Sequence, residues 1–254
     1  MKLLIVNADD LGRCPGVDAG IMRAHRDGIV TASTLMANSP DAEHAAALAR
    51  EAPSLDVGVH LVLTFGRPVS DPSRIPSLLE TDGAFPSRPG PVYGRARAEE
   101  VLVEYRAQYA RARDLLGREP THLDSHHFVH DDPEVASALG ELAVETGAAA
   151  RVQGQAHKTA YRALGIRTPD RFCREFQFAG HIDVPALEAI LGRIAGAGEG
   201  VTELMCHPGD PDGELLAHST YASERATEVV TLTDPRIREA VAEAGLELAT
   251  FADL

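Results

Sequence analysis

The sequence has few of the features that mark secreted or membrane proteins. Its three cysteines, Cys14, Cys173 and Cys206, lie far apart and form no CxxC pair. This spacing argues against a disulfide framework or a cysteine-based zinc site and favours a reduced cytoplasm. No apolar run is long enough to span a membrane, and the first residues lack the apolar region and cleavage site of a signal peptide. We therefore expect a cytoplasmic protein with no membrane partner.

Positive charge is also scarce. The formal net charge is -14, and only Lys2 and Lys158 are lysines. Such a chain offers no basic field to a phosphate backbone, so we expect no nucleic-acid partner.

Several familiar catalytic motifs are missing as well. The chain has no GxSxG, no HExxH and no P-loop. The glycine-rich stretch 196–200 follows a predicted helix, whereas a phosphate-binding glycine loop follows a strand. We interpret this stretch as a turn between a helix and a strand.

What the chain has is the composition of a globular domain with a substantial core. It is 254 residues long, 44% hydrophobic and 24% charged. An α/β barrel commonly uses about 250 residues as one unit, so we expect a single domain over 1–254.

Apolar runs alternate with stretches of helical periodicity, which predicts repeated βα units around a parallel sheet. Strands are expected at 2–7, 30–36, 57–63, 121–125, 148–152, 203–206 and 246–250. Helices are expected at 17–27, 42–51, 99–116, 133–146, 184–197, 223–232 and 236–244. The stretches 66–97 and 153–180 are irregular and too long for simple connections, so we expect lids or binding loops there, or else disorder.

The placement of polar residues favours a barrel over an open sheet. Polar or ionisable side chains stand at or near the carboxyl ends of five predicted strands, and a barrel builds one site from many such ends. An open sheet concentrates its site at one switch point instead. These residues are Asn7, Asp9, Asp10, His60, His126, His130, Arg151 and His207.

Asp9 and Asp10 form an adjacent pair at the end of a buried strand, where an unpaired charge is costly. Adjacent residues point in different directions, so one carboxylate can ligate a cation while the other acts on a bound water as general base. The alternative is that one of them caps the following helix. For the pair alone, this alternative carries equal weight.

The segment 120–130 holds four histidines and an aspartate. In an extended chain His122, Asp124 and His126 project to one face, which suits a metal ligand and its supporting partners. A solvated loop of histidines is the alternative, and the apolar residues of the segment argue against it. His60 stands alone in an apolar strand, where a histidine is more often a hydrogen-bonded core residue than a ligand.

His207 ends a predicted strand before a Pro-Gly turn and could act as a general acid or simply stabilise the turn. Together with the other segments it completes a set of one carboxylate and several histidines, which suits Zn²⁺ and other divalent ions.

The segments NADDLG at 7–12, GIVTAST at 28–34, VGVHLVLT at 57–64, PTHLDSHHFVH at 120–130 and ELMCHPG at 203–209 follow one another along nearly the whole chain. In this order the chain resembles the YdjC-like carbohydrate deacetylases, which include the chitooligosaccharide deacetylases and hopanoid-associated relatives.

The resemblance implies a (βα) barrel, TIM-like and irregular, of the glycoside hydrolase/deacetylase type. It also implies a divalent metal, Mg²⁺ or Zn²⁺, and removal of the acetyl group from chitooligosaccharides or a related N-acetylglucosamine derivative. By position, Asp10, His60 and His126 match the metal ligands, Asp9 the general base and His207 the candidate acid. The residues 11, 13–15 and 66–97 depart from the chitooligosaccharide pattern, which leaves the acetylated substrate open.

The resulting hypothesis is metal-assisted amide hydrolysis. In it, four further residues contact the substrate or hydrogen-bond to the metal ligands: His122, Asp124, His130 and Arg151. The alternatives are a metal-dependent hydrolase of another acetylated or esterified substrate, and an inactive sugar-binding barrel. The family resemblance also favours a homodimer.

Overall fold

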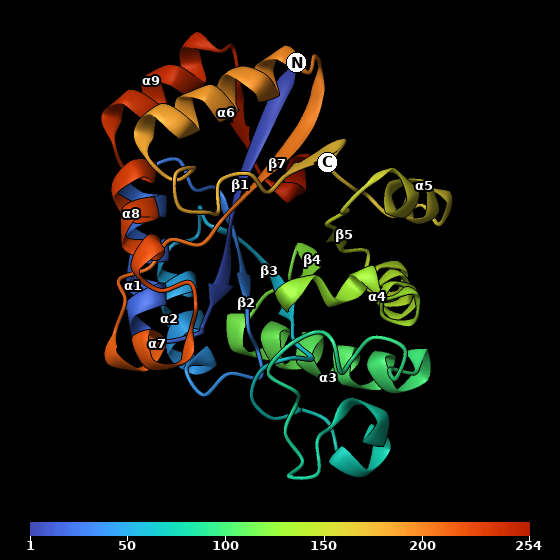
Figure 1. Ribbon diagram of the computed structural model, residues 1–254. Coiled ribbons are helices and arrows are strands. Elements are labelled where there is room, and N and C mark those ends of the chain that lie inside the picture. Colours follow the sequence, from blue (N-terminus) through green and yellow to red (C-terminus); the bar gives the residue numbers. More distant parts are fainter.

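The computed structural model describes residues 1–254, apart from the side chains of Glu214 and His218. Parallel strands form a curled sheet with helices outside it (Figure 1). The strands are β1 (Lys2–Leu11), β2 (Ala32–Leu35), β3 (Asp56–Leu61), β4 (His122–Ser125), β5 (Ala149–Ala150), β6 (Arg171–Cys173), β7 (Gly200–Cys206) and β8 (Glu247–Ala249).

The helices fill the connections between the strands. They are α1 (Pro15–Asp27), α2 (Ala42–Glu51), α3 (Ala98–Leu116), α4 (Pro133–Thr146), α5 (Gln155–Ala163), α6 (Val184–Gly196), α7 (Gly213–His218), α8 (Ser223–Leu232) and α9 (Pro235–Glu243). Short 3-10 turns follow β3, β4 and β8: η1 (Pro72–Arg74), η2 (Pro76–Leu78), η3 (His126–Asp131) and η4 (Phe251–Asp253).

The strand order is β5-β4-β3-β2-β1-β7-β6, and β8 pairs with the first half of β1. The edges of this sheet approach each other through the segment before β6. There the Ala150 N–H donates to the Arg167 carbonyl (3.0 Å), and the Asp170 N–H donates to the Val201 carbonyl (2.9 Å). The predicted barrel is confirmed, as an irregular one in which β5 and β6 do not form a regular ladder.

Most predicted elements are confirmed within a few residues, but two regions differ. The stretch 153–180, expected to be irregular, contains α5 and β6, and α7 was also not predicted. Helix α5 buries only Tyr161, and β6 is three residues long, so neither produces a clear periodic pattern. Strand β5 is shorter than the predicted 148–152.

Strand β1 also runs further than predicted, so Asp9 and Asp10 lie within it rather than after it. From Ala8 to Leu11 it spans three residue steps, while its partner β2 spans only two, from Ser33 to Leu35. This one-residue excess is a β-bulge, a device that re-aims side chains and is common beside active sites.

One apolar layer lies between the sheet and the helices, and a smaller apolar cluster lies inside the barrel next to its polar residues. Leu4, Val6 and Ala8 of β1 face the helices and belong to the main core, whereas Ile5 belongs to a separate cluster inside the barrel. That cluster is formed by Ile5, Ala32, Ala149, Ala249 and Phe251. Because side chains alternate along a strand, Asn7 and Asp9 follow Ile5 on the interior side.

His122 of β4 lies directly above this apolar cluster and stacks on Phe251, with ring centroids 3.7 Å apart. Gly58 makes room for it, because a Cβ at that position would lie 2.3 Å from the His122 carbonyl oxygen and 2.7 Å from the ring. Any side chain at position 58 would therefore displace the strand that carries the polar residues.

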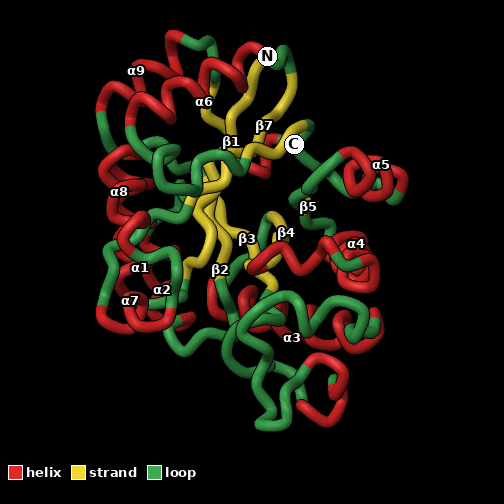
Figure 2. The backbone as a smooth tube through the Cα atoms, viewed as in Figure 1, coloured by secondary structure: helices red, strands yellow, loops and turns green.

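The long segment 66–97, drawn as a looping tube in Figure 2, is fastened to α3. Glu104 is fully buried and accepts hydrogen bonds from the backbone N–H groups of Val69 and Ser70, both at 2.9 Å. Its neighbour Gln108 bonds both the N–H and the carbonyl of Val62, at 2.8 and 2.7 Å. The segment is thus an ordered part of the barrel rim. Within the part of the chain that the structure describes, no helix is both long and apolar enough to cross a membrane.

We predict that Glu104→Ala lowers the free energy of unfolding by about 2–4 kcal/mol, because it leaves the partly buried N–H groups of Val69 and Ser70 without an acceptor. The rim segment should also become sensitive to limited proteolysis. Glu99→Ala, an exposed position on the same helix, is the control and should change stability by less than about 0.5 kcal/mol. Equal urea unfolding midpoints for the two variants would contradict this role of Glu104.

Candidate metal centre and active site

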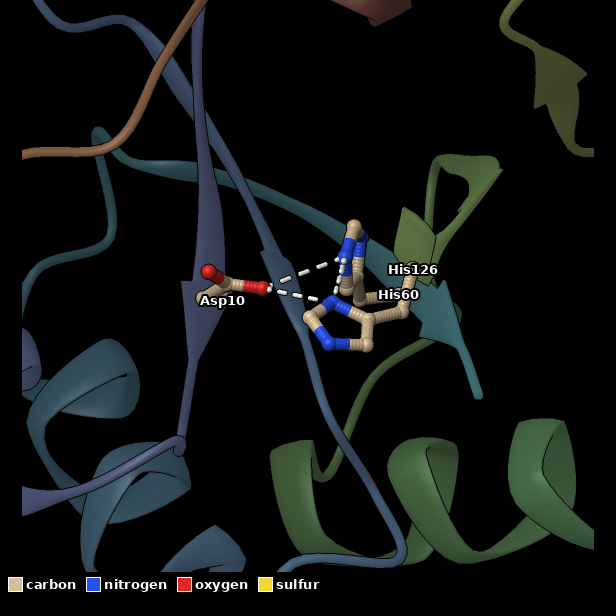
Figure 3. A group of neighbouring side chains, drawn as sticks. All are labelled: Asp10, His60 and His126. Atoms are coloured by element: carbon tan, nitrogen blue, oxygen red, sulfur yellow. Dashed lines mark hydrogen bonds and ion pairs between the residues drawn. The ribbon is translucent and has the colours of Figure 1, made fainter. Parts of the chain in front are cut away.

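Three side chains from different strands converge at one end of the barrel: Asp10 of β1, His60 of β3 and His126, the first residue after β4 (Figure 3). Asp10 Oδ1 lies 3.3 Å from His60 Nε2 and 3.0 Å from His126 Nδ1. The two ring nitrogens are 3.2 Å apart. The three atoms therefore form a nearly equilateral triangle.

Unusual backbone conformations hold two of these side chains in place. Asp10, at the β1 bulge, has φ +74°, and the two residues after His126, His127 and Phe128, have φ +55° and +56°. Residues other than glycine rarely adopt such angles, which cost on the order of 1–3 kcal/mol each and cluster at functional sites.

The triangle fits a divalent cation. Ligand atoms about 2.1 Å from a tetrahedral ion lie roughly 3.4 Å apart, close to the separations seen here. Asp10 Oδ1 is buried and has no hydrogen-bond partner among the described residues, although two ring nitrogens lie beside it. A cation bound there would offset the free-energy cost of burying this oxygen without a partner.

His60 has the partner that a ligating histidine usually has. Its other nitrogen, Nδ1, lies 2.7 Å from Asp124 Oδ1, and Thr34 Oγ1 donates to Asp124 Oδ2 at 3.0 Å. This arrangement fixes the tautomer and the ring orientation. Burial opposes protonation of His60, but Asp124 and Asp10 outweigh it and raise the pKa of His60 to about 10. The carboxylates therefore make this end of the barrel attractive to positive charge.

Asp9 is held by Arg151. The two guanidinium nitrogens Nη1 and Nη2 each donate to one oxygen of Asp9, both at 2.7 Å, and Asn7 Nδ2 adds a third hydrogen bond at 2.8 Å. Burial would raise the pKa of Asp9, but the charge of Arg151 outweighs it and lowers the pKa to about 2. Asp9 is thus an oriented, ionised carboxylate at neutral pH.

His207 follows β7, and its Nε2 lies 4.0 Å from Asp9 Oδ2. Its backbone N–H donates to the buried Glu228 at 2.5 Å, and its own Nδ1 is buried without a hydrogen-bond partner among the described residues. Burial lowers the pKa of His207 to about 4, so its imidazole is neutral at pH 7.

The other four sequence candidates are fully buried, and three of them, His122, Asp124 and Arg151, lie beneath these groups. Asp124 supports His60, and Arg151 joins Asp9 to Asp124 (3.0 Å) and Glu203 (2.7 Å). His122 Nε2 lies 3.0 Å from Asn7 Oδ1, one layer below Asp9. His130 Nδ1 lies 2.5 Å from Ser125 Oγ, on the far side of β4. Their functional roles stay predictions.

The alternative interpretation of the aspartate pair, a helix cap, is wrong. Helix α1 begins after Cys14 and has no side-chain cap, and both aspartates make other contacts. Instead Asp18, inside α1, accepts the N–H of Gly12 at 2.6 Å and so fixes the turn after the pair.

Three residues of the site are not predicted from the sequence: Arg225, Glu203 and Glu228. Arg225 contacts Asp10, and Glu203 contacts Arg151. A lone glutamate in the apolar strand β7 is the same kind of signal as His60 in β3 and could have identified Glu203. Arg225 and Glu228 lie on the amphipathic helix α8 together with the charged Glu224, and no local pattern distinguishes them from it.

A family model for YdjC-like proteins matches residues 3–243. The chain belongs to the YdjC-like family. It is 41% identical over 253 residues to a carbohydrate deacetylase of Geobacillus stearothermophilus, covering 99% of this chain and 98% of that one. It is 37% identical over 259 residues to a chitooligosaccharide deacetylase of Salmonella paratyphi B, covering 100% and 99%.

Solved structures show the same fold. A protein of Enterococcus faecalis described as a candidate cellobiose-phosphate cleavage protein superposes with a TM-score of 0.91 at 34% identity, covering 99% of this chain and 98% of that one. A family 4 carbohydrate esterase from Streptomyces lividans, in complex with acetate, has a TM-score of 0.54 at 12% identity, covering 98% and 92%. At that identity the second likeness concerns the fold alone.

We predict that Asp18 makes stability depend on pH. Burial and the neighbouring Asp41 raise the pKa of Asp18 to about 8, above the unfolded value of about 3.9. The contribution of protonated Asp18 to the free energy of unfolding is therefore complete below about pH 4 and is lost as the pH rises toward 8. Asp18→Asn keeps an oxygen for Gly12 without ionising, so its urea unfolding midpoint should fall less between pH 5 and 8.5 than that of the wild type.

The exposed variant Glu43→Gln is the control for this measurement and should follow the wild-type pH profile. If Asp18→Asn and the wild type lose stability in parallel over this range, Asp18 is ionised in the folded protein and the prediction is wrong.

Proposed function

We propose that this protein is a metal-dependent deacetylase that hydrolyses the N-acetyl group of short N-acetylglucosamine oligomers or a related sugar. The observation that carries the proposal is one cluster that combines a buried Asp10–His60–His126 donor set with Asp9 and His207. The carbohydrate deacetylase and chitooligosaccharide deacetylase relatives, matched along nearly their whole length, support the substrate class.

Asp10, His60 and His126 would hold a divalent cation, Mg²⁺ or Zn²⁺. When bound, such an ion polarises the acetyl carbonyl and increases the acidity of a nearby water. Asp124 keeps His60 oriented for this role through its contact with Nδ1.

Asp9 receives the proton of the attacking water. Its pKa of about 2 makes it a weak base in isolation, but Arg151 and Asn7 fix its orientation and keep it ionised before each turnover. The oxygen of the water then forms a bond to the acetyl carbon while Asp9 holds the proton.

His207 delivers a proton to the leaving nitrogen. Its Nε2 lies 4.0 Å from Asp9 Oδ2, a separation that a small movement can close, so the proton collected by Asp9 can reach the amine through His207. The C–N bond breaks, and acetate and the free amine leave. Since the pKa of His207 is about 4, it carries the extra proton only briefly.

The fully buried His122, Asp124 and Arg151 support the reacting groups from beneath in this scheme, and His130 stays a predicted substrate contact or supporting residue. A cytoplasmic location, the homodimer and the single domain over 1–254 stay predictions of the sequence analysis.

The proposal is tested by measuring acetate release from N-acetylglucosamine oligomers by protein stripped of metal and resupplied with Mg²⁺, Mn²⁺, Co²⁺ or Zn²⁺. We expect metal to restore activity in the wild type and in the exposed control His44→Ala, but not in His60→Ala. Metal binding without acetate release would favour another acetylated or esterified substrate. No metal binding at all would favour a sugar-binding barrel without activity.

Asp9→Asn separates catalysis from metal binding. We expect kcat to fall by roughly 10²–10⁴-fold, the usual contribution of a general base, while the metal content measured by elemental analysis stays at the wild-type level. A variant with wild-type turnover would remove Asp9 from the mechanism.

A further inference from the structure

Helix α8 brings into the metal centre an arginine to which the proposed mechanism gives no role. The Arg225 side chain is buried, and its Nη2 donates to Asp10 Oδ2 at 2.5 Å. Its Nε donates to the backbone carbonyl of Tyr221 at 3.0 Å, which fixes the plane of the guanidinium.

The two oxygens of Asp10 are divided between two sets of partners. Oδ2 is occupied by Arg225, whereas Oδ1 lies beside His60 Nε2 and His126 Nδ1. A carboxylate held in this way can offer only Oδ1 to a cation and cannot rotate to offer the other.

A structural role alone does not account for this arginine. Arg225 Nη1 is buried without a hydrogen-bond partner among the described residues, a cost that an apolar side chain would not carry. Buried ion pairs are also often no more stabilising than well-packed apolar residues. The strained backbone of Asp10, at φ +74°, does need an external contact to hold its side chain in one orientation.

The first turns of α8 also contact the backbone around His207, the proposed general acid. Glu228, three residues after Arg225, accepts the N–H of His207, and the Arg225 carbonyl accepts the N–H of Gly209 at 3.3 Å. The same helix segment therefore sets the distance between Asp10 and the strand end that carries His207.

We propose that Arg225 is a positioning residue for the metal centre, which holds Asp10 with Oδ1 turned toward the cation. This inference rests on the proposed metal-dependent function. Helix α8, late in the sequence, thereby controls the orientation of Asp10, a ligand that β1 supplies at the beginning of the chain.

The test is isothermal titration of metal-free protein with Zn²⁺ and, separately, Mg²⁺, with no substrate present. Removal of an outer contact to a metal ligand commonly costs 10–100-fold in affinity, and we expect that loss for Arg225→Met. Arg225→Lys keeps the charge but loses the planar fork, so its affinity should lie between those of Arg225→Met and the wild type. The control is Arg238→Met, which removes an arginine that donates to the Gly28 carbonyl, and it should bind metal like the wild type.

The outcomes separate the two proposals. If the wild type binds neither ion, the metal-dependent function itself is wrong. If the wild type binds metal and folded Arg225→Met binds it with equal affinity, the function stands and the role of Arg225 is wrong. Circular dichroism establishes folding, and should Arg225→Met not fold, Arg225→Gln decides by the same criterion.

Discussion

The extra residue in β1 is the constraint on which the rest of the site depends. In a regular strand Asp9 and Asp10 would point to opposite faces, and one carboxylate would enter the apolar layer beneath the helices. The bulge between Ala8 and Leu11, with Asp10 at φ +74°, lets both carboxylates join the polar interior while Leu11 returns to the core. Aspartate tolerates this backbone conformation better than most residues.

Two carboxylates in one buried space require two compensating charges. Arg151 supplies one from the end of β5 and bridges Asp9, Asp124 and Glu203, while Arg225 supplies the other from α8. The single charge of Arg151 does not fully balance the three carboxylates around it. Burial raises the pKa of Glu203 to about 7 despite its contact with Arg151. A buried network of this kind is weak as a source of stability, so the fold relies on the apolar layers below and outside it.

The sequence could predict the residues that interrupt an apolar strand but not those that complete the charge balance. His60 stands out because it interrupts an apolar strand, and the histidines at 120–130 stand out because they cluster. Their meeting point follows from the parallel arrangement of the strands. Arg225 is one of three charged residues on α8, beside Glu224 and Glu228, and no local pattern shows that it contacts Asp10 across 215 residues. Strand β6 is missed for a related reason, since three residues are too few to show a period.

The two adjacent aspartates are both buried and ionised, and they differ in which of their oxygens an arginine contacts. Arg151 contacts both oxygens of Asp9, so this carboxylate is fixed in plane and low in pKa, and it can take a proton only as the reaction supplies one. Arg225 contacts one oxygen of Asp10 and leaves Oδ1 beside the two histidines. The number of oxygens that each guanidinium occupies therefore distinguishes the proposed base from the proposed ligand. Because arginine presents its donors in a rigid fork, a lysine in place of Arg151 could hold the charge but could not contact both oxygens of Asp9 in one plane.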